Sequence, residues 1–289
     1  MKLEAGQVAV VTGAANGIGR AVAQALCARG IRVVLADIDG EAVAKGADEI
    51  GSSAMAVPTD VADPAQVQRL ADTTLESYGR VDLVFNNAGI GVGGPIWLVE
   101  PEDWQRVWSV NVQGVVNGMR AFVPHLVAAG RGHIVNTSSM AGVTTGLFNG
   151  PYTASKHAVV SLTEALHGEL GVLSPGIGVT VVCPGPVDTQ MLRGITDGDQ
   201  SWLGDGDSLP PQPSEGWFGT LTPEQWERFA PGLGAVRQLA HEAMPAERAA
   251  EIILAAVEAD RLYVTTHPHW AAQATDRMDT IVADLRASV

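Results

Sequence analysis

Short apolar runs alternate along the chain with segments whose apolar residues recur at helical spacing. The runs cover residues 8–11, 32–36, 54–57, 81–85, 133–137, 179–182 and 262–265. Largely continuous apolar runs are typical of strands that are buried on both faces of a parallel sheet. Helical patterns lie between them, for example over 40–50 and 102–128. The alternation predicts a single α/β domain over residues 1–289, with a doubly wound parallel sheet of about seven strands and helices on both faces.

Composition and charge narrow the class of protein. The chain is 46% hydrophobic and 17% charged, which is typical of a globular protein. Its net charge of −14 argues against binding to nucleic acid or to an anionic membrane surface. Cys27 and Cys183 are far apart in the sequence and are predicted to be buried free thiols. Without a secretory signal or an apolar run of transmembrane length, the chain is expected to be cytoplasmic.

A glycine-rich turn follows the first apolar run. Residues 12–19 read Thr-Gly-Ala-Ala-Asn-Gly-Ile-Gly, and a helical pattern begins within them. Glycines let the backbone approach a pyrophosphate, and the helix N-terminus favours its negative charge. The alternative is an ordinary tight turn that requires positive φ. The order of strand, turn and helix favours a Rossmann-like dinucleotide site formed by Gly13, Asn16, Gly17, Ile18 and Gly19.

An acidic residue follows the second run. Asp37 lies 18 positions after Gly19, near the spacing at which a carboxylate accepts hydrogen bonds from both hydroxyls of the adenine ribose. That carboxylate repels a 2′-phosphate, and no Arg or Lys occurs at 14–18 or 38–40 to bind one. The sequence therefore predicts NAD rather than NADP. Ile38, Asp60 and Val61 are expected at the adenosine end of the site.

Small residues and amides follow the fourth run. Asn87, Ala88 and Gly89 come directly after a predicted buried strand. Open α/β sheets bind their ligands at the carboxyl ends of the strands. These three residues are therefore expected to line the trough that holds the cofactor.

Tyr152 and Lys156 form the main candidate for chemistry. Residues four apart on a helix share one face, one turn apart. A neighbouring positive charge lowers the pKa of a phenol from about 10 and turns it into a usable general base. The alternative is a tyrosine on a helix surface beside a solvated lysine. Ser138 and Ser139 end the fifth run at the same predicted sheet edge, and the chemistry alone allows either hydroxyl to take part.

An amide interrupts the apolar face of the helix predicted over 102–128. Asn111 lies between two valines, and burying an unsatisfied amide costs free energy. Asn111 therefore needs a hydrogen-bonding role, either structural or catalytic. Pro124 is expected to bend or end this helix.

In combination, these motifs resemble the short-chain dehydrogenase/reductase family. The matching residues are Thr12, Gly13, Gly17, Gly19, Asp60, 86–89, Asn111, Ser139, Tyr152, Lys156, Pro184, Gly185 and Thr189. The match covers about 6–190 and the closing strand near 262–265. Each motif alone is weak or moderate, whereas their occurrence together in this order is specific.

The resemblance implies a role for each matching residue. Tyr152 is the acid/base, and Lys156 lowers its pKa and binds the nicotinamide ribose. Ser139, the second serine of its pair, binds the substrate oxygen, and Asn111 holds a water that relays protons from Lys156. Beyond Pro184 and Gly185, the resemblance assigns Val187 and Thr189 to the nicotinamide carboxamide. It also implies a homo-oligomer, either a dimer or a tetramer.

The substrate is expected to meet the segment 190–221, which reads as a long irregular loop with Trp202, Trp217 and Phe218. In the family, this place covers the substrate. The aromatic residues predict a pocket for a bulky, hydrophobic or aromatic secondary alcohol or ketone; the alternative is that they only anchor the loop. The segment 132–142 is similar to members that act on lignin-derived aryl alcohols, and equally compatible with terpenoid or steroid alcohols.

The predicted activity is thus an NAD-dependent alcohol dehydrogenase/ketone reductase. An epimerase or dehydratase on the same fold and a non-catalytic NAD-binding regulator or scaffold are the rival functions. No metal site is expected, because the acids of the 190–221 loop lack EF-hand spacing and His267 and His269 lack a third ligand. The tail over 267–289 is a C-terminal extension, and the sequence leaves open whether it packs on the pocket or on a neighbouring subunit.

Overall fold

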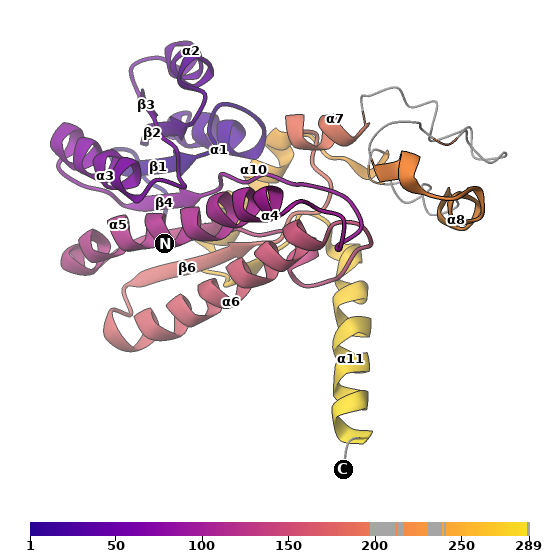
Figure 1. The fold of residues 1–289 in the computed structure, drawn as a ribbon. Coiled ribbons are helices and arrows are strands. Elements are labelled where there is room, and N and C mark those ends of the chain that lie inside the picture. The colour runs from indigo at the N-terminus through magenta and orange to yellow at the C-terminus, as the bar shows by residue number, and fades with distance from the viewer. Residues whose placement is uncertain (197–211, 213–216, 231–238, 240, 288–289) are drawn as a thin grey trace.

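Seven parallel strands form one sheet at the centre of the molecule. The computed structural model describes residues 1–196, 212, 217–230, 239 and 241–287. The strand order is β3-β2-β1-β4-β5-β6-β7 (Figure 1). The strands are β1 (Val8–Thr12), β2 (Arg32–Asp37), β3 (Ala54–Pro58), β4 (Leu83–Asn86), β5 (Gly132–Thr137), β6 (Ile177–Val182) and β7 (Tyr263–Val264). The chain order reverses between β1 and β4, and open sheets bind ligands at the carboxyl edge of such a switch point.

Helices cover both faces of the sheet. On one face, α1 (Gly17–Cys27) and α10 (Ala246–Glu258) bury Leu26 and Leu254 against the odd-numbered residues of β1. The other face is covered by α3 (Pro64–Tyr78), α5 (Gly114–Ala129) and α6 (Gly150–Leu173), which contribute Leu70, Phe122 and Leu166. Every residue of β1, β4 and β5 is buried, as the continuous apolar runs indicated. The prediction of a Rossmann-like doubly wound sheet is therefore confirmed.

The long helix predicted over 102–128 contains a π-helical interruption and continues past Pro124. It consists of α4 (Pro101–Trp108), a π-helical turn η1 (Ser109–Gln113) and α5, in direct succession. Pro124 was expected to bend or end this helix. It does not end the helix, because α5 continues to Ala129. Proline has no N–H to donate to the carbonyl group one turn earlier in the helix. Pro124 is exposed, so water can donate to that carbonyl instead. The helix ends instead at Gly130, whose φ of 65° lies in the left-handed region.

Helix α7 (Gln190–Thr196) occupies the start of the segment that was expected to be irregular. The hydroxyl of Thr189 accepts a hydrogen bond from the backbone N–H of Leu192 at 3.4 Å, an N-terminal capping signal that the sequence reading missed. Further along, η4 (Trp217–Thr220) and α8 (Pro223–Phe229) are described. Trp202 and the acidic residues between 197 and 207 lie outside the described residues.

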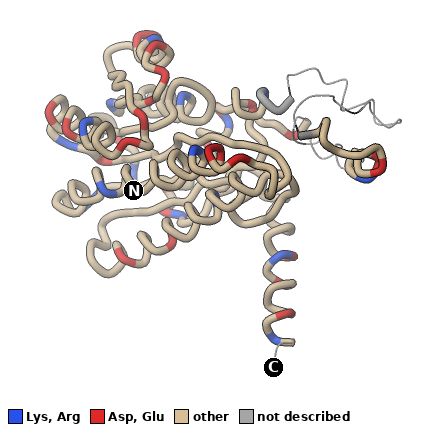
Figure 2. Tube along the Cα trace, viewed as in Figure 1, with Lys and Arg blue, Asp and Glu red and all other residues tan. Residues whose placement is uncertain are grey.

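The remaining described helices are α2 (Gly40–Ile50), η2 (Met140–Gly142), η6 (Pro268–Trp270) and α11 (Ala271–Ala287). Helix α11 projects from the body as a separate rod (Figure 1). None of the described helices has the length and hydropathy that a membrane-spanning segment requires. Figure 2 shows the positions of acidic and basic residues along most of the outer helices, including α11.

Close packing between α5 and β4 leads to a first prediction. A Cβ atom on Gly118 would overlap the side chain of Asn86, whose Nδ2 donates to Asn136 Oδ1 at 2.8 Å. We expect Gly118→Ala to destabilise the protein by about 1–3 kcal/mol, since the buried amide pair must move. Gly168→Ala on α6 is the matched control, because its Cβ meets no atom within 4 Å. Thermal unfolding followed by circular dichroism should show a lower midpoint for Gly118→Ala only, and equal midpoints would contradict the prediction.

Candidate active site

The predicted site residues converge on one edge of the sheet. The carboxyl ends of β1, β4, β5 and β6 lead into Gly13, Asn87, Ser138 and Cys183 respectively. Because these strands are parallel neighbours, the loops that follow them meet at the same edge. The topology thus brings together segments that are up to 170 positions apart in the sequence, from Gly13 to Cys183.

The hydroxyl of Thr12 holds the glycine-rich turn against the loop after β4. Its Oγ1 accepts hydrogen bonds from the backbone N–H groups of Asn87 (2.9 Å) and Ala88 (3.1 Å). The side chain of Asn87 donates back to the carbonyl of Thr12 at 3.0 Å and accepts from Thr137 Oγ1 at 3.2 Å. Three strand ends, β1, β4 and β5, are therefore linked by short side chains. Thr12 was matched only as the first residue of the glycine motif, and its bridging role was not predicted.

The glycine-rich turn fits a ligand that needs close backbone approach. Gly13 has a φ of 65°, and a Cβ there would lie 2.8 Å from the Cα of Ala88. A Cβ on Gly17 would lie 2.9 Å from Cγ2 of Thr189, so the loop after β6 meets this turn. The side chain of Asn16, which precedes α1, makes no capping hydrogen bond, and the first turn contains no acidic residue. The N-terminal N–H groups of α1 therefore remain suited to a phosphate group, and Ile18 and Gly19 lie in the same turn.

The carboxylate of Asp37 lies beside the glycine-rich turn. Its Oδ2 accepts from the backbone N–H of Ala15 at 3.0 Å, and its Oδ1 accepts from Asp39 at 3.1 Å. Arg20, the first cationic residue after the glycine-rich turn, forms an ion pair with Glu49. Acidic character therefore dominates at the end of β2, as the sequence predicted.

Three further predicted residues lie near that end of the trough. The side chain of Ile38 is 74% exposed, whereas Val61 is buried and its carbonyl accepts from Asn117 Nδ2 at 2.8 Å. Asp60 Oδ1 accepts from the backbone N–H of Ala62 at 2.9 Å. The exposed Ile38 offers an apolar surface to a flat ring, and Asp60 shapes the turn that follows β3.

Lys156 is buried one turn after Tyr152 on α6. Its Nζ donates to the carbonyl of Thr137 at 2.9 Å and lies 5.4 Å from the centroid of the Tyr152 ring. Burial lowers the pKa of Lys156 to about 8. A Cβ on Gly89 would lie 3.2 Å from Nζ, so the loop after β4 closes over the ammonium group. The alternative of a solvated surface lysine is therefore excluded by its burial.

The expectation of a lowered Tyr152 pKa is wrong for this structure, in which that pKa is raised above its ordinary value. Burial raises the pKa of the Tyr152 phenol, and a hydrogen bond with Ser139 lowers it. Lys156 does not lower the pKa of Tyr152 here; its ammonium group lies over the face of the ring and donates to the carbonyl of Thr137. The hydrogen bond from Ser139 is thus the contact that favours the phenolate in this structure.

The two serines after β5 occupy different environments. Ser138 is buried and its hydroxyl donates to the carbonyl of Lys156 at 2.8 Å, which anchors β5 to α6. Ser139 Oγ accepts from the backbone N–H of Ala141 at 3.1 Å and shares the hydrogen bond with Tyr152. The ambiguity that the sequence left between them is resolved by position, since only Ser139 contacts the phenol.

Asn111 has the hydrogen-bonding role that its burial required. It lies in the π-helical turn η1, an irregularity that is frequent at functional sites. Its Oδ1 accepts from the N–H of Ile90 at 2.8 Å, and its Nδ2 donates to the carbonyl of Ile90 and to Ser155 Oγ, both at 2.9 Å. Ser155 in turn donates to the carbonyl of Tyr152 at 2.7 Å. Ser155 was missed by the sequence reading, although a small polar residue inside the Tyr–Lys turn was a possible signal.

The loop after β6 closes the site from the side of the C-terminal segments. The N–H of Gly185, next to Pro184, donates to Thr266 Oγ1 at 3.0 Å, and Val187 pairs with Met244 in an isolated β-bridge. Thr266 Oγ1 lies 2.7 Å from Nδ1 of the buried His267. His267 therefore supports the loop, and the described residues contain no cluster of side chains suited to a metal ion.

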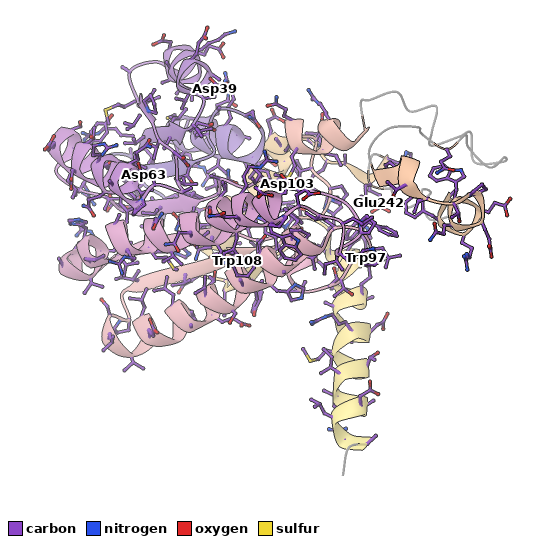
Figure 3. All side chains as sticks on the ribbon, in the orientation of Figure 1. Asp39, Asp63, Trp97, Asp103, Trp108 and Glu242 are labelled. Atoms are coloured by element: carbon purple, nitrogen blue, oxygen red, sulfur yellow. The ribbon has the colours of Figure 1, made fainter. Side chains whose placement is uncertain are left out.

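Three apolar residues, called the apolar rim here, lie in the loop after β4 (Ile96 and Trp97) and just before α6 (Phe148). The loop after β4 exposes Ile96 and Trp97, the latter 77% exposed and visible at the surface in Figure 3. The carbonyl of Phe148 accepts from the N–H of Gly94 at 2.8 Å, which ties this loop to the start of α6. Gly91 of the same loop approaches the Tyr152 ring, since its Cβ would lie 3.6 Å from Cδ2.

Phe148 also contacts the aromatic residues of α8. Its ring lies edge-on to Phe229 with 4.9 Å between the centroids, and Phe229 packs with Phe218 and Trp226. Its φ of 57° is unusual for a bulky residue and is held by the hydrogen bond of its carbonyl. Of the aromatic residues expected to shape the pocket, Phe218 belongs to this cluster, whereas the side chain of Trp217 lies outside the described part.

Comparison with known proteins identifies the family. The model of the short chain dehydrogenase family matches residues 7–200. The chain belongs to the short-chain dehydrogenase family. The resemblance inferred from the motifs is thereby confirmed, and the matched span contains Tyr152, Lys156 and both strand-end serines.

Several relatives of this short-chain dehydrogenase are known. A short-chain dehydrogenase/reductase from Burkholderia phymatum, solved in complex with NAD, is 37% identical and superposes with a TM-score of 0.81 over 98% of this chain and 97% of that one. The 1-deoxy-11-beta-hydroxypentalenate dehydrogenase of Streptomyces exfoliatus is 42% identical over 66% of this chain and 70% of its own. The sorbitol dehydrogenase of Cereibacter sphaeroides is 38% identical over 68% and 75%. The NAD prediction agrees with the cofactor of the Burkholderia phymatum protein.

The buried lysine of this short-chain dehydrogenase gives a pH dependence with a defined sign. The pKa of Lys156 is about 8 in the folded chain, below its ordinary value of 10.5. The unfolded chain thus binds more protons between these values, and the contribution of Lys156 to stability rises with pH there. We therefore compare the thermal unfolding midpoints of the wild type and Lys156→Met at several pH values. The difference, wild type minus variant, should increase as the pH is raised from about 8 to about 9.5. Calorimetry without cofactor measures this, and an exposed-lysine control, Lys45→Met, should show no such trend.

Proposed function

We propose that this chain is an NAD-dependent dehydrogenase/reductase that interconverts a secondary alcohol and its ketone on a bulky hydrophobic or aromatic frame. The observation that carries the proposal is the position of Tyr152, Ser139 and Lys156 at the sheet edge that also carries the glycine-rich turn. The phenol and the Ser139 hydroxyl share a hydrogen bond, and the lysine is buried behind the phenol ring. A proton acceptor and a hydroxyl donor therefore face the place where a dinucleotide would end.

The protein residues handle the proton of the reaction. In the oxidation of an alcohol, Tyr152 Oη takes the proton of the substrate hydroxyl. General base catalysis of this kind accelerates a reaction by about 10² to 10⁴-fold. Ser139 Oγ donates a hydrogen bond to the substrate oxygen and keeps it within reach of the phenol. The hydrogen bond from Ser139 favours the negative phenolate, whereas burial opposes it. In the reduction of a ketone, the same atoms return the proton.

The proposed role of Asn111 is to keep this arrangement in place. Its side chain fixes the backbone of Ile90 and, through Ser155, the first turn of α6 that bears Tyr152. The water relay from Lys156 that the family resemblance implies would run past the same turn. Rigid support of this kind holds a general base within hydrogen-bonding distance of its substrate.

The residues at the sheet edge fit NAD. Gly13, Asn16, Gly17, Ile18 and Gly19 would hold the pyrophosphate, and Asp37, Ile38, Asp60 and Val61 the adenosine. Asn87, Ala88 and Gly89 would line the trough, while Pro184, Gly185, Val187, Thr189, Tyr152 and Lys156 would surround the nicotinamide riboside. When bound, NAD supplies the acceptor or donor of the hydride. Asp37 supports NAD over NADP, because its carboxylate would repel a 2′-phosphate.

The apolar rim supports a hydrophobic substrate. Ile96 and Trp97 are exposed, and their loop is tied by the hydrogen bond from Gly94 to Phe148, just before the helix that bears Tyr152. The relatives are named as dehydrogenases of substrates as different as sorbitol and a hydroxypentalenate. The apolar rim of this chain is therefore a better guide to its substrate than the names of its relatives. Burial of an aromatic or alicyclic frame against such side chains stabilises the bound substrate.

The experiment that tests the function is a cofactor and substrate assay. Purified protein is mixed with NAD or NADP and a panel of secondary alcohols, and the absorbance of the reduced cofactor is followed. We expect turnover with NAD on aryl or alicyclic alcohols, and a loss of about 10² to 10⁴ in kcat for Tyr152→Phe with NAD binding retained. Tyr78→Phe on α3 is the matched control and should leave kcat unchanged.

The rival functions give different results in the same assay. A non-catalytic NAD-binding protein would bind NAD without any turnover, and full activity of Tyr152→Phe would refute the role of its phenol. An epimerase or dehydratase would change the substrate without net reduction of NAD. A preference for NADP would contradict the argument from Asp37.

The contact between Phe148 and α8 leads to a prediction about substrate choice. We expect Phe148→Ala to raise KM about tenfold for an aryl secondary alcohol such as 1-phenylethanol, because an apolar wall is lost. KM for 2-propanol and for NAD should stay unchanged. Leu147→Ala is the matched control, since Leu147 is the preceding residue and is 85% exposed. Equal changes for both alcohols would mean that Phe148 does not contact the substrate frame.

A further inference from the structure

His267 lies inside the protein, although no step of the proposed reaction uses it. It is 4% exposed and precedes η6 in the segment that follows β7. Burying a polar ring costs free energy unless its nitrogens have hydrogen-bonding partners. Nδ1 lies 2.7 Å from Thr266 Oγ1, and Nε2 lies 3.0 Å from the carbonyl oxygen of Glu242, a residue labelled in Figure 3. The ring therefore links the segment after β7 to a residue 25 positions earlier.

The partners of His267 determine which ring nitrogen carries the proton. The carbonyl oxygen of Glu242 can only accept, so Nε2 of the neutral ring carries the hydrogen. Nδ1 is then an acceptor, and the hydroxyl of Thr266 donates to it. Thr266 Oγ1 in turn accepts from the backbone N–H of Gly185 at 3.0 Å. The hydrogen bonds thus form one directed chain from the N–H of Gly185 to the carbonyl of Glu242.

Gly185 also packs directly on the imidazole ring. A Cβ atom on Gly185 would lie 2.6 Å from Nδ1 of His267 and 2.7 Å from its Cγ. A residue without a side chain lets the backbone come this close to the ring. The packing and the hydrogen-bonded chain together fix the start of the loop between β6 and α7.

Met244, two residues after Glu242, holds the middle of the same loop. Val187 pairs with Met244 in a parallel β-bridge. The N–H of Asp188 donates to the carbonyl of Met244 at 2.8 Å, and the N–H of Met244 donates to the carbonyl of Pro186 at 3.1 Å. Successive backbone groups of an extended strand point to opposite sides. The N–H and C=O of Val187 therefore point away from Met244.

We propose that His267 is a positioning residue for the nicotinamide end of the cofactor. The hydrogen-bonded chain holds Gly185, and with it the backbone of Val187, in the place where the nicotinamide carboxamide would bind. The inference rests on the proposed function, which assigns both residues to the nicotinamide riboside. The adenosine and pyrophosphate would bind at Asp37 and the glycine-rich turn, so His267 acts on the nicotinamide end alone.

Two ligands that differ in the nicotinamide test this proposal. ADP-ribose has the adenosine, the pyrophosphate and the second ribose of NADH but no nicotinamide. Thr266→Val removes the hydroxyl with little change of shape and leaves the N–H of Gly185 without its acceptor. We expect the Kd of NADH to rise about tenfold, because a buried donor loses its partner. The Kd of ADP-ribose should stay unchanged in calorimetric titrations. Thr266→Ser retains the hydroxyl and is the matched control, with wild-type affinity for both ligands.

The two amide variants of His267 separate its two contacts. The amide oxygen of His267→Asn can take the place of Nδ1 and accept from Thr266, whereas the amide nitrogen of His267→Gln can take the place of Nε2 and donate to Glu242. His267→Asn should therefore keep the wild-type Kd of NADH, and His267→Gln should raise it about tenfold. Adding Thr266→Val to His267→Gln should raise it no further, because both changes break the same chain. A side chain that only fills space gives the opposite order, since asparagine leaves the larger cavity.

Several results would overturn the proposal. Wild-type affinity of Thr266→Val for NADH would do so, and so would an equal loss of affinity for ADP-ribose. The opposite order of the amide variants would reduce His267 to a packing role. Thermal unfolding shows which variants are folded, and the comparison of Thr266→Val with Thr266→Ser decides the matter if a His267 variant is not.

Turnover of the wild type on a secondary alcohol is measured in parallel. An active wild type with unchanged NADH affinity in every variant would refute this inference alone. A wild type that does not bind NADH would refute the proposed function, and this inference with it.

Discussion

The buried ammonium group of Lys156 is the constraint around which the site is arranged. A buried cation is costly unless hydrogen bonds and nearby electron-rich groups compensate. Here the carbonyl of Thr137 accepts from it, the Tyr152 ring lies beside it and Gly89 covers it. Each of these partners comes from a different element, so placing one charge requires β5, α6 and the loop after β4 to keep their relative positions.

The surrounding hydrogen bonds extend this requirement. Ser138 ties β5 to α6 through the carbonyl of Lys156, and Asn111 ties the π-helical turn to Ile90 and Ser155. Thr12 joins the glycine-rich turn to the loop after β4. The site is therefore a set of short links between strand ends, which explains how residues far apart in sequence remain within one hydrogen bond of each other.

Much of the fold was predictable because its signals are local. Continuous apolar runs marked the buried strands, and the strand, glycine turn and helix at 8–26 marked the dinucleotide unit. Errors arose where local signals competed. Pro124 lies within α5 because it is exposed to water, and α7 was missed because its cap depends on the single hydroxyl of Thr189. The roles of the site residues remain predictions, although the structure brings Tyr152, Lys156, Ser139 and Asn111 together.

By itself, the sequence determined the order of strands and helices, the spacing of Tyr152 and Lys156 on one helix face and the acid at the end of β2. These are properties of a few consecutive residues, and backbone periodicity is enough to interpret them. Only the tertiary structure decided which of the two serines contacts the phenol, what Asn111 and Ser155 hold, and why burial rather than Lys156 dominates the pKa of Tyr152. Those outcomes depend on distances between separate elements, and such distances are set by the packing of the whole sheet.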